Sequence, residues 1–173
     1  KDWLVDDMNN FRKLGLASFD IIDISAVPRS IWLKSFKNAD VLVFGGGNVY
    51  HLLSWIRKSG LEKVLPELLK TKVYVGISAG SMVTAKHISL STAGILYYEK
   101  TGGFKDKNGL GFVDFELRPH LNSKWFPKVR LPYLEKLASK IPYSFYAIDD
   151  DTAIKVVDGK ISIVSEGEWK KFN

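Results

Sequence analysis

The stretch VYVGISAGSMV, residues 73–83, holds a serine between two glycines, where a strand is predicted to end and a helix to begin. Val73, Tyr74 and Val75 are β-branched or aromatic, which favours a strand, whereas the residues from 81 onward suit a helix. Gly-x-Ser-x-Gly between a strand and a helix is the nucleophile-elbow pattern. The stretch therefore predicts a reactive serine, Ser78, at the carboxyl end of a strand, the edge at which parallel sheets bind ligands.

The turn around Ser78 has two properties that would activate its hydroxyl. The backbone bends so tightly that side chains at Gly76 and Gly80 would collide, and the bend lifts the hydroxyl above the sheet. The hydroxyl also lies at a helix N-terminus, where free amides and the helix dipole favour developing negative charge. A serine before a helix is also a common N-cap, but the preceding strand and the following helix favour a nucleophile.

Composition limits the class of protein. The chain has 173 residues and no cysteine, which excludes a disulfide framework, cysteine zinc sites and a thiol nucleophile. No apolar run approaches the roughly 20 residues of a membrane span, and the first residues, KDWLVDDMNN, do not resemble a signal peptide. We therefore expect a cytoplasmic protein without a membrane partner.

The formal net charge of +6 raises the question of nucleic-acid binding. The lysines are scattered along the chain, and many fall at the ends or on the polar faces of predicted helices. No basic run or base-stacking motif accompanies them. We therefore expect a solvated basic surface and no nucleic-acid partner.

Apolar patterns and turn signals predict helices and strands in alternation. We expect helices over residues 2–14, 27–40, 49–60, 61–71 and 127–141, the last interrupted near Pro132, and strands over 19–25, 41–48, 72–77, 112–120, 143–149, 152–157 and 160–165. Residues 87–111 are expected to be irregular, and Asp158-Gly159 is a strong hairpin signal. This order predicts a single α/β domain over residues 1–173 with a mostly parallel sheet. Because such sheets usually open with a strand, we expect an N-terminal strand to be missing.

A serine nucleophile needs a general base and donors for an oxyanion. Of the three histidines, His120 directly follows a predicted strand in LRPHLNS, residues 117–123, and so should lie on the same rim of the sheet as Ser78. The glycines of FGGGN, residues 44–48, also end a strand. They lack the spacing of a nucleotide-binding loop, whereas a glycine amide can approach a substrate closely. Ala79, which follows the nucleophile, would supply another amide.

Three motifs in this order, VLVFGGGN, GISAGS and LRPHLNS, resemble the peptidase E family of alpha-aspartyl dipeptidases, to which cyanophycinases are related. The resemblance implies a flavodoxin-like three-layer sandwich related to class I glutamine amidotransferase domains. It implies serine catalysis without a metal or an organic cofactor, on dipeptides with N-terminal aspartate or on β-linked aspartyl-arginine polymers. Carried over to this chain, Ser78 is the nucleophile, His120 the base, and Gly46 or Gly47 with Ala79 the oxyanion donors.

The resemblance places the acid of the triad between the serine and the histidine. We favour Glu99, because the apolar and aromatic residues before it could seat it partly buried. Asp106 lies between lysines in a glycine-rich loop and is expected to be solvated. Asp114 and Glu116, on the strand before His120, remain alternatives.

A dipeptidase for Asp-X peptides also needs a cation for the substrate carboxylate. Strand alternation gives Arg118 the same face as His120, and Asn122 could donate a hydrogen bond to the substrate. The residues together with the resemblance therefore imply a serine peptidase for small aspartyl peptides, which we expect to be a monomer or a homodimer. The alternative is a catalytically inactive amidotransferase-like binding module.

Overall fold

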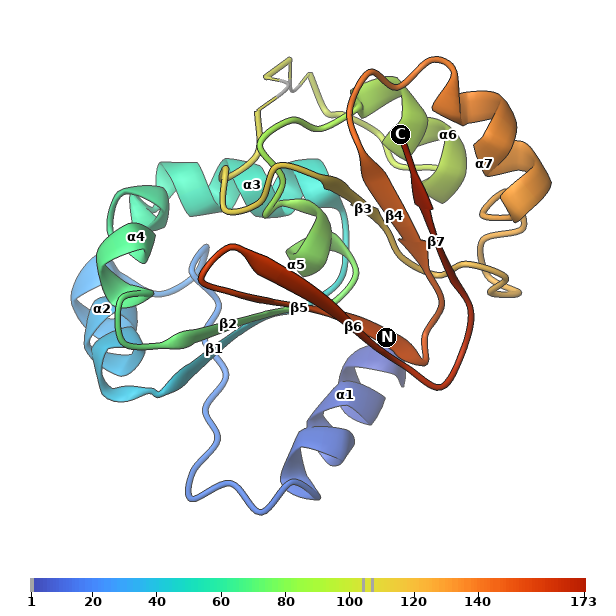
Figure 1. Ribbon diagram of the computed structural model, residues 1–173. Coiled ribbons are helices and arrows are strands. Elements are labelled where there is room, and N and C mark those ends of the chain that lie inside the picture. The colour runs from blue at the N-terminus through green and yellow to red at the C-terminus, as the bar shows by residue number, and fades with distance from the viewer. Residues whose placement is uncertain (1, 104, 107) are drawn as a thin grey trace.

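The computed structural model describes residues 2–103, 105–106 and 108–173, and its strands pair in three groups (Figure 1). β1 (Val41–Phe44) pairs in parallel with β2 (Val73–Gly76). β3 (Glu116–Arg118) pairs in parallel with β4 (Phe145–Ile148), and β7 (Trp169–Phe172) is antiparallel to β4. β5 (Thr152–Val157) and β6 (Lys160–Ser165) form an antiparallel hairpin. The predicted α/β class with parallel strand pairing is confirmed.

The helices lie mainly around the β1–β2 pair and beside the β3–β4–β7 sheet (Figure 1). They are α1 (Asp2–Arg12), α2 (Arg29–Asn38), α3 (Val49–Lys58), the 3₁₀ turn η1 (Leu61–Lys63), α4 (Leu65–Leu68), α5 (Ala79–Met82), α6 (Leu90–Tyr97) and α7 (Leu131–Ala138). Within the described ranges, no helix combines the length and the apolar character needed to cross a membrane.

The larger hydrophobic core explains why α3 forms where it does. Its buried residues are Val49, Tyr50, Leu53 and Ile56, a spacing that gathers them on one face of the helix. This face packs in one cluster with the inward side chains of β1, Leu42 and Phe44. A smaller cluster forms between β3, β4 and the hairpin. The two clusters hold β2, β3 and β4 in position, and the candidate site lies where these strands end.

Two predictions of local structure are wrong. Residues 19–25 form no strand, because Asp23 accepts hydrogen bonds from the amide and the hydroxyl of Ser25, at 2.8 and 2.6 Å. Such a local turn competes with sheet pairing. The segment 87–111 contains α6, which buries Ala93, Leu96 and Tyr97 in the larger core. Tertiary packing thus stabilises a helix that the glycine-rich sequence did not predict.

The C-terminal part also differs in detail from the prediction. Pro132 lies in the first turn of α7, where a helix tolerates proline, and so it does not interrupt the helix. β7 was not predicted; its pairing with β4 covers an edge of that strand. The predicted hairpin at Asp158-Gly159 is confirmed, and both residues have positive φ, as its tight turn requires.

Candidate active site

Ser78 occupies a sharp turn between β2 and α5. β2 ends at Gly76 and α5 begins at Ala79, and the backbone of Ser78 has φ 52° and ψ −113°. A β-carbon on Gly76 would lie 2.6 Å from the backbone of Gly80, and one on Gly80 would overlap the carbonyl oxygen of Phe44. The two glycines of the motif are therefore required by the close approach of backbone to backbone.

Backbone hydrogen bonds tie this turn to the end of β1. The amide of Ile77 donates to the carbonyl of Phe44 at 2.9 Å, and the amide of Gly80 donates to the carbonyl of Gly45 at 3.1 Å. The hydroxyl of Ser81 donates to the carbonyl of Ser78 at 2.6 Å. These contacts fix a backbone conformation that a serine rarely adopts.

His120 lies against the hydroxyl of Ser78. Its Nε2 is 2.9 Å from Ser78 Oγ. It follows β3 after Pro119, whose carbonyl accepts a hydrogen bond from the hydroxyl of Tyr97, and its ring stacks on Phe126 with the ring centres 4.9 Å apart. The structure thus brings together the two side chains that the sequence assigned to one rim of the sheet.

The other ring nitrogen of His120 contacts Asp150, two residues after the end of β4. Nδ1 is 2.7 Å from Asp150 Oδ1. The backbone explains this proximity: the amide of Leu121 donates to the carbonyl of Ile148 at 2.9 Å, which holds the ends of β3 and β4 side by side. The Asp150 side chain is 62% exposed and the His120 side chain 22% exposed. An acid, an imidazole and a hydroxyl therefore form a continuous hydrogen-bonded chain.

Here the structure differs from the sequence prediction, which placed Glu99 against the histidine. The carboxylate of Glu99 instead accepts a hydrogen bond from the amide of Val49 at 3.0 Å. The physical reason is topological, because β4 pairs directly with β3 and its carboxyl end is the nearest neighbour of His120. Asp150 was missed, although YAIDDD, residues 146–151, carries the same signal that identified His120: a polar residue just after a buried strand.

The three alternative acids also lie elsewhere. Asp106 forms an ion pair with Arg57 at 2.8 Å. Asp114 is exposed, and Glu116 is buried in contact with Arg118 and accepts a hydrogen bond from the hydroxyl of Ser89 at 2.6 Å. The partners of Asp106 and Glu116 account for the positions of these two carboxylates.

The residues predicted to bind substrate have other contacts. Arg118 is only 1% exposed; it pairs with Glu116 and packs over the ring of Phe145. The prediction assumed alternating exposure along β3, but all three of its residues are buried. The side-chain amide of Asn122 donates to Glu168 at 2.6 Å. Neither Arg118 nor Asn122 is among the described residues that line the pocket beside Ser78.

The predicted oxyanion donors lie around the serine. A β-carbon on Gly46 would be 3.8 Å from Ser78 Oγ, so this stretch of backbone passes close to the hydroxyl. Gly47 has φ 123° and lines the pocket. Ala79 is the first residue of α5, and the first amides of a helix have no acceptor four residues earlier within it. The backbone here can offer amides to a developing negative charge.

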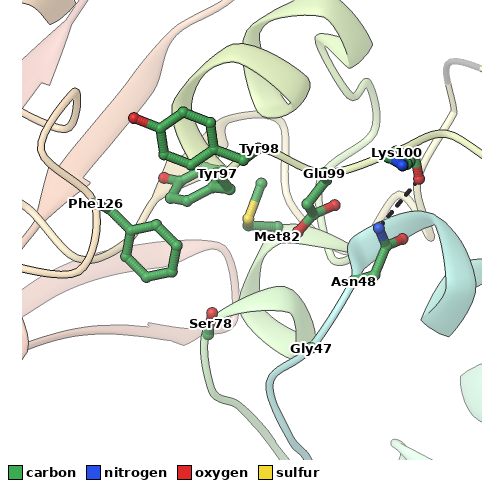
Figure 2. Close-up of a pocket in the computed structure, with 9 residues that line it drawn as sticks. All are labelled: Gly47, Asn48, Ser78, Met82, Tyr97, Tyr98, Glu99, Lys100 and Phe126. Atoms are coloured by element: carbon green, nitrogen blue, oxygen red, sulfur yellow. Dashed lines mark hydrogen bonds between the residues drawn. The ribbon is translucent and has the colours of Figure 1, made fainter.

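A pocket of about 440 Å³ opens beside Ser78. Its lining residues are Gly47, Asn48, Ser78, Met82, Tyr97, Tyr98, Glu99, Lys100 and Phe126. Figure 2 shows Ser78 and Gly47 on one side of it and the residues of the α6 end on the other, with the side-chain amide of Asn48 donating to the carbonyl of Lys100 at 3.1 Å. The volume is that of a small-molecule site.

Two charged residues, Glu99 and Lys100, line this pocket. Burial raises the pKa of Glu99 from 4.5 to about 7, although the hydrogen bond from the Val49 amide acts in the opposite direction. Among the described residues, no group of three or more His, Asp or Glu side chains is arranged to hold a metal ion. The reactive side chains at the site are those of Ser78, His120, Asp150 and Glu99.

Comparison with known families decides the relationship. Residues 1–164 match the model of peptidase family S51. The chain belongs to peptidase family S51. Its S51 relatives include the uncharacterized peptidase Lmo0363 of Listeria monocytogenes, 29% identical over 134 residues, 77% of this chain and 64% of that protein. Peptidase E of Shewanella oneidensis is 34% identical over 108 residues, 59% of this chain and 42% of that protein.

A solved structure supports the fold. The 1.5 Å crystal structure of a candidate peptidase E protein from Listeria monocytogenes EGD-e superposes with a TM-score of 0.71 and 23% identity, over 86% of this chain and 70% of that chain. The S51 chain thus shares its α/β architecture with that protein. The matched region of the chain spans 64% of the length of Lmo0363 and 42% of the length of the Shewanella oneidensis peptidase E.

Proposed function

We propose that this S51 chain is a serine-dependent peptide hydrolase that cleaves small peptides with an N-terminal aspartate. The observation that carries the proposal is the hydrogen-bonded chain from Asp150 through His120 to Ser78, with distances of 2.7 and 2.9 Å. Membership of a peptidase family and the resemblance to peptidase E support the same reaction class.

The geometry suggests a role for each group in an acyl-enzyme mechanism. Asp150 accepts the Nδ1 proton and so keeps Nε2 of His120 free to take the proton of the Ser78 hydroxyl. Oγ attacks the scissile carbonyl, and amides at Gly46 or Gly47 and at Ala79 stabilise the oxyanion. The imidazolium then protonates the departing amine, and water hydrolyses the ester.

The pocket supports a small acidic substrate. A volume of about 440 Å³ suits a short peptide better than a folded protein. With Arg118 buried, Lys100 takes its place in the proposal as the cation for the aspartyl carboxylate, because it lines the pocket. Lys128 adds positive charge nearby, since its Nζ lies 4.9 Å from the ring centre of Tyr98.

Hydrolysis of an Asp-X chromogenic substrate by the wild type and by Ser78→Ala tests the proposal. We expect turnover by the wild type only, and covalent labelling of Ser78 by a fluorophosphonate probe. Equal rates for the two proteins would end the catalytic assignment. Absence of both turnover and labelling would favour a non-catalytic binding module.

A further inference from the structure

Glu99 is a carboxylate that lines the pocket and has no role in the proposed mechanism. One oxygen, Oε2, accepts the hydrogen bond from the amide of Val49, the first residue of α3. In the described ranges, Glu99 forms no ion pair with a lysine, arginine or histidine of the chain, although Lys100 is its neighbour in sequence. One carboxylate oxygen thus remains for a ligand.

The surroundings of Glu99 make an unpaired negative charge costly. Met82, Tyr97 and Phe126 line the same pocket and bring apolar surface to it. A half-buried carboxylate in such surroundings gains most from a cation that enters with a ligand. The raised pKa of Glu99 is consistent with this, because burial is its largest cause.

The position of Glu99 limits which cation could pair with it. Ser78 and Glu99 line one pocket of about 440 Å³, and Figure 2 shows them on facing sides of it. When Ser78 attacks the carbonyl of a peptide's first residue, the α-nitrogen lies only two bonds from the attacked carbon. A free α-ammonium is compact and carries three donors, and it is the cationic group of the peptide that lies nearest the attacked carbonyl.

We propose that Glu99 binds the free α-ammonium of the substrate's N-terminal residue, so that the site accepts unblocked N-termini and rejects blocked or deaminated ones. This inference rests on the proposed function for its orientation of the peptide. Glu99 is here a binding and specificity-determining residue, and Lys100, next to it, meets the side-chain carboxylate of the same residue. Together they match the opposite charges of an N-terminal aspartate.

Binding measured without turnover tests the inference. The ligands are Asp-Leu and succinyl-leucine, which is Asp-Leu without its amino group and adds no bulk. Calorimetric titration of Ser78→Ala at pH 7.5 should show Asp-Leu binding about 10-fold tighter or more, the scale of a hydrogen bond to a charged group. In Ser78→Ala/Glu99→Gln the preference should fall to about 2-fold or less, because a neutral amide keeps the Val49 contact but not the charge.

Ser78→Ala/Glu135→Gln is the matched control, since Glu135 pairs with Lys170 and does not line the pocket. It should keep the full preference for Asp-Leu. Thermal unfolding of each variant checks that the substitutions leave the fold intact. An equal preference in Ser78→Ala and Ser78→Ala/Glu99→Gln would overturn the inference, and so would the absence of measurable Asp-Leu binding to Ser78→Ala.

The two proposals can fail separately. If the wild type hydrolyses Asp-X peptides while the Glu99→Gln change leaves the ligand preference intact, the ammonium site is wrong and the peptidase assignment stands. If the wild type neither hydrolyses these peptides nor reacts with a fluorophosphonate, yet the preference disappears with Glu99→Gln, the ammonium site stands and the catalytic assignment fails.

Discussion

At the scale of single residues, the backbone of Ser78 is the most informative feature. Its φ of 52° and ψ of −113° lie outside the regions that side chains favour, and similar positive φ values occur at His120 and Asn122. Strain of this kind costs on the order of 1–3 kcal/mol per residue and persists only where surrounding contacts enforce it. The stabilising contacts are those of the turn to Phe44 and Gly45.

We predict that Ser78→Gly is more stable than Ser78→Ala by about 1 kcal/mol, because glycine adopts this conformation without a steric penalty. Both variants lack the nucleophile and should be inactive. Urea unfolding followed by fluorescence measures the difference. A glycine variant no more stable than the alanine variant would show that the turn is not strained.

Asp150→Asn should lower kcat/KM for an Asp-X substrate by about 10²–10⁴-fold, since an amide no longer holds His120 in the productive tautomer. Asp151→Asn is the control, because Asp151 is the exposed neighbour of Asp150 in the same turn. It should retain nearly full activity. Similar losses in both variants would remove Asp150 from the proposed mechanism.

The positions of Ser78 and His120 follow from one rule, that side chains just after parallel strands meet at one edge of the sheet. The same rule applies to Asp150, which follows the buried strand β4. The family resemblance instead placed the acid in the interval between the serine and the histidine. Glu99 was expected to be partly buried, and it is half-buried, but it lines the pocket and is not the residue that contacts His120.

At the scale of elements, α5 packs closely against the end of β1. A β-carbon on Gly80 would overlap the Phe44 carbonyl, and the Gly80 amide donates to Gly45. This close contact places the start of α5, and with it Ser78, directly above the end of β1. The helix is only four residues long, so its position depends on this contact.

Gly80→Ala should therefore reduce the free energy of unfolding by at least about 2 kcal/mol, because backbone atoms must move to admit the methyl group. Gly45→Ala is the matched comparison. Its β-carbon would meet no described atom within 4 Å, and we expect a change of about 0.5 kcal/mol or less. Equal stability of the two variants would contradict the packing described for α5.

The elements that the sequence predicted are stabilised differently from those that it did not predict. α3 was predicted because its apolar residues repeat at helical spacing and pack on one core. α6 and the turn at Asp23 depend on contacts that the pattern does not contain: α6 on burial of Leu96 and Tyr97, and the turn on its hydrogen bonds to Ser25. Periodicity identifies elements with their own amphipathic face and misses those held by their surroundings.

At the scale of the whole molecule, the ionisation of Glu99 makes the free energy of unfolding depend on pH. Its pKa is about 7 in the folded protein and 4.5 as the ordinary value, so between these pH values the folded state binds more protons than the unfolded state. The free energy of unfolding therefore falls as pH rises from about 4.5 to 7. The lowered pKa values of Asp23 and Asp149 give slopes of the opposite sign.

Comparison with Glu99→Gln isolates this contribution, since the slopes from Asp23 and Asp149 are common to both proteins. We expect Glu99→Gln to match the wild type near pH 4 and to exceed its stability by about 1–2 kcal/mol at pH 8, after allowance for solvent screening. Urea unfolding at several pH values measures the difference. A constant difference across this range would contradict the burial of Glu99 as a charged group.

The α/β class and the presence of parallel strand pairs followed from alternating patterns, because those patterns report which elements bury which faces. The pairing of β7 with β4 and the separation into three groups of strands did not follow. Pairing depends on which strand edges remain open after packing, and a single sequence carries little information on that.

The hydroxyl follows β2 and the imidazole follows β3, and within the described ranges no strand ladder joins the β1–β2 pair to the β3–β4–β7 sheet. Their contact therefore bridges two sheets that share the larger hydrophobic core, and slight loosening between the sheets would break it while the strands within each sheet stay paired. Fluorophosphonate reactivity should disappear at lower urea than the far-ultraviolet circular dichroism of the helices. Coincident midpoints would instead mean that the two sheets unfold as one cooperative unit.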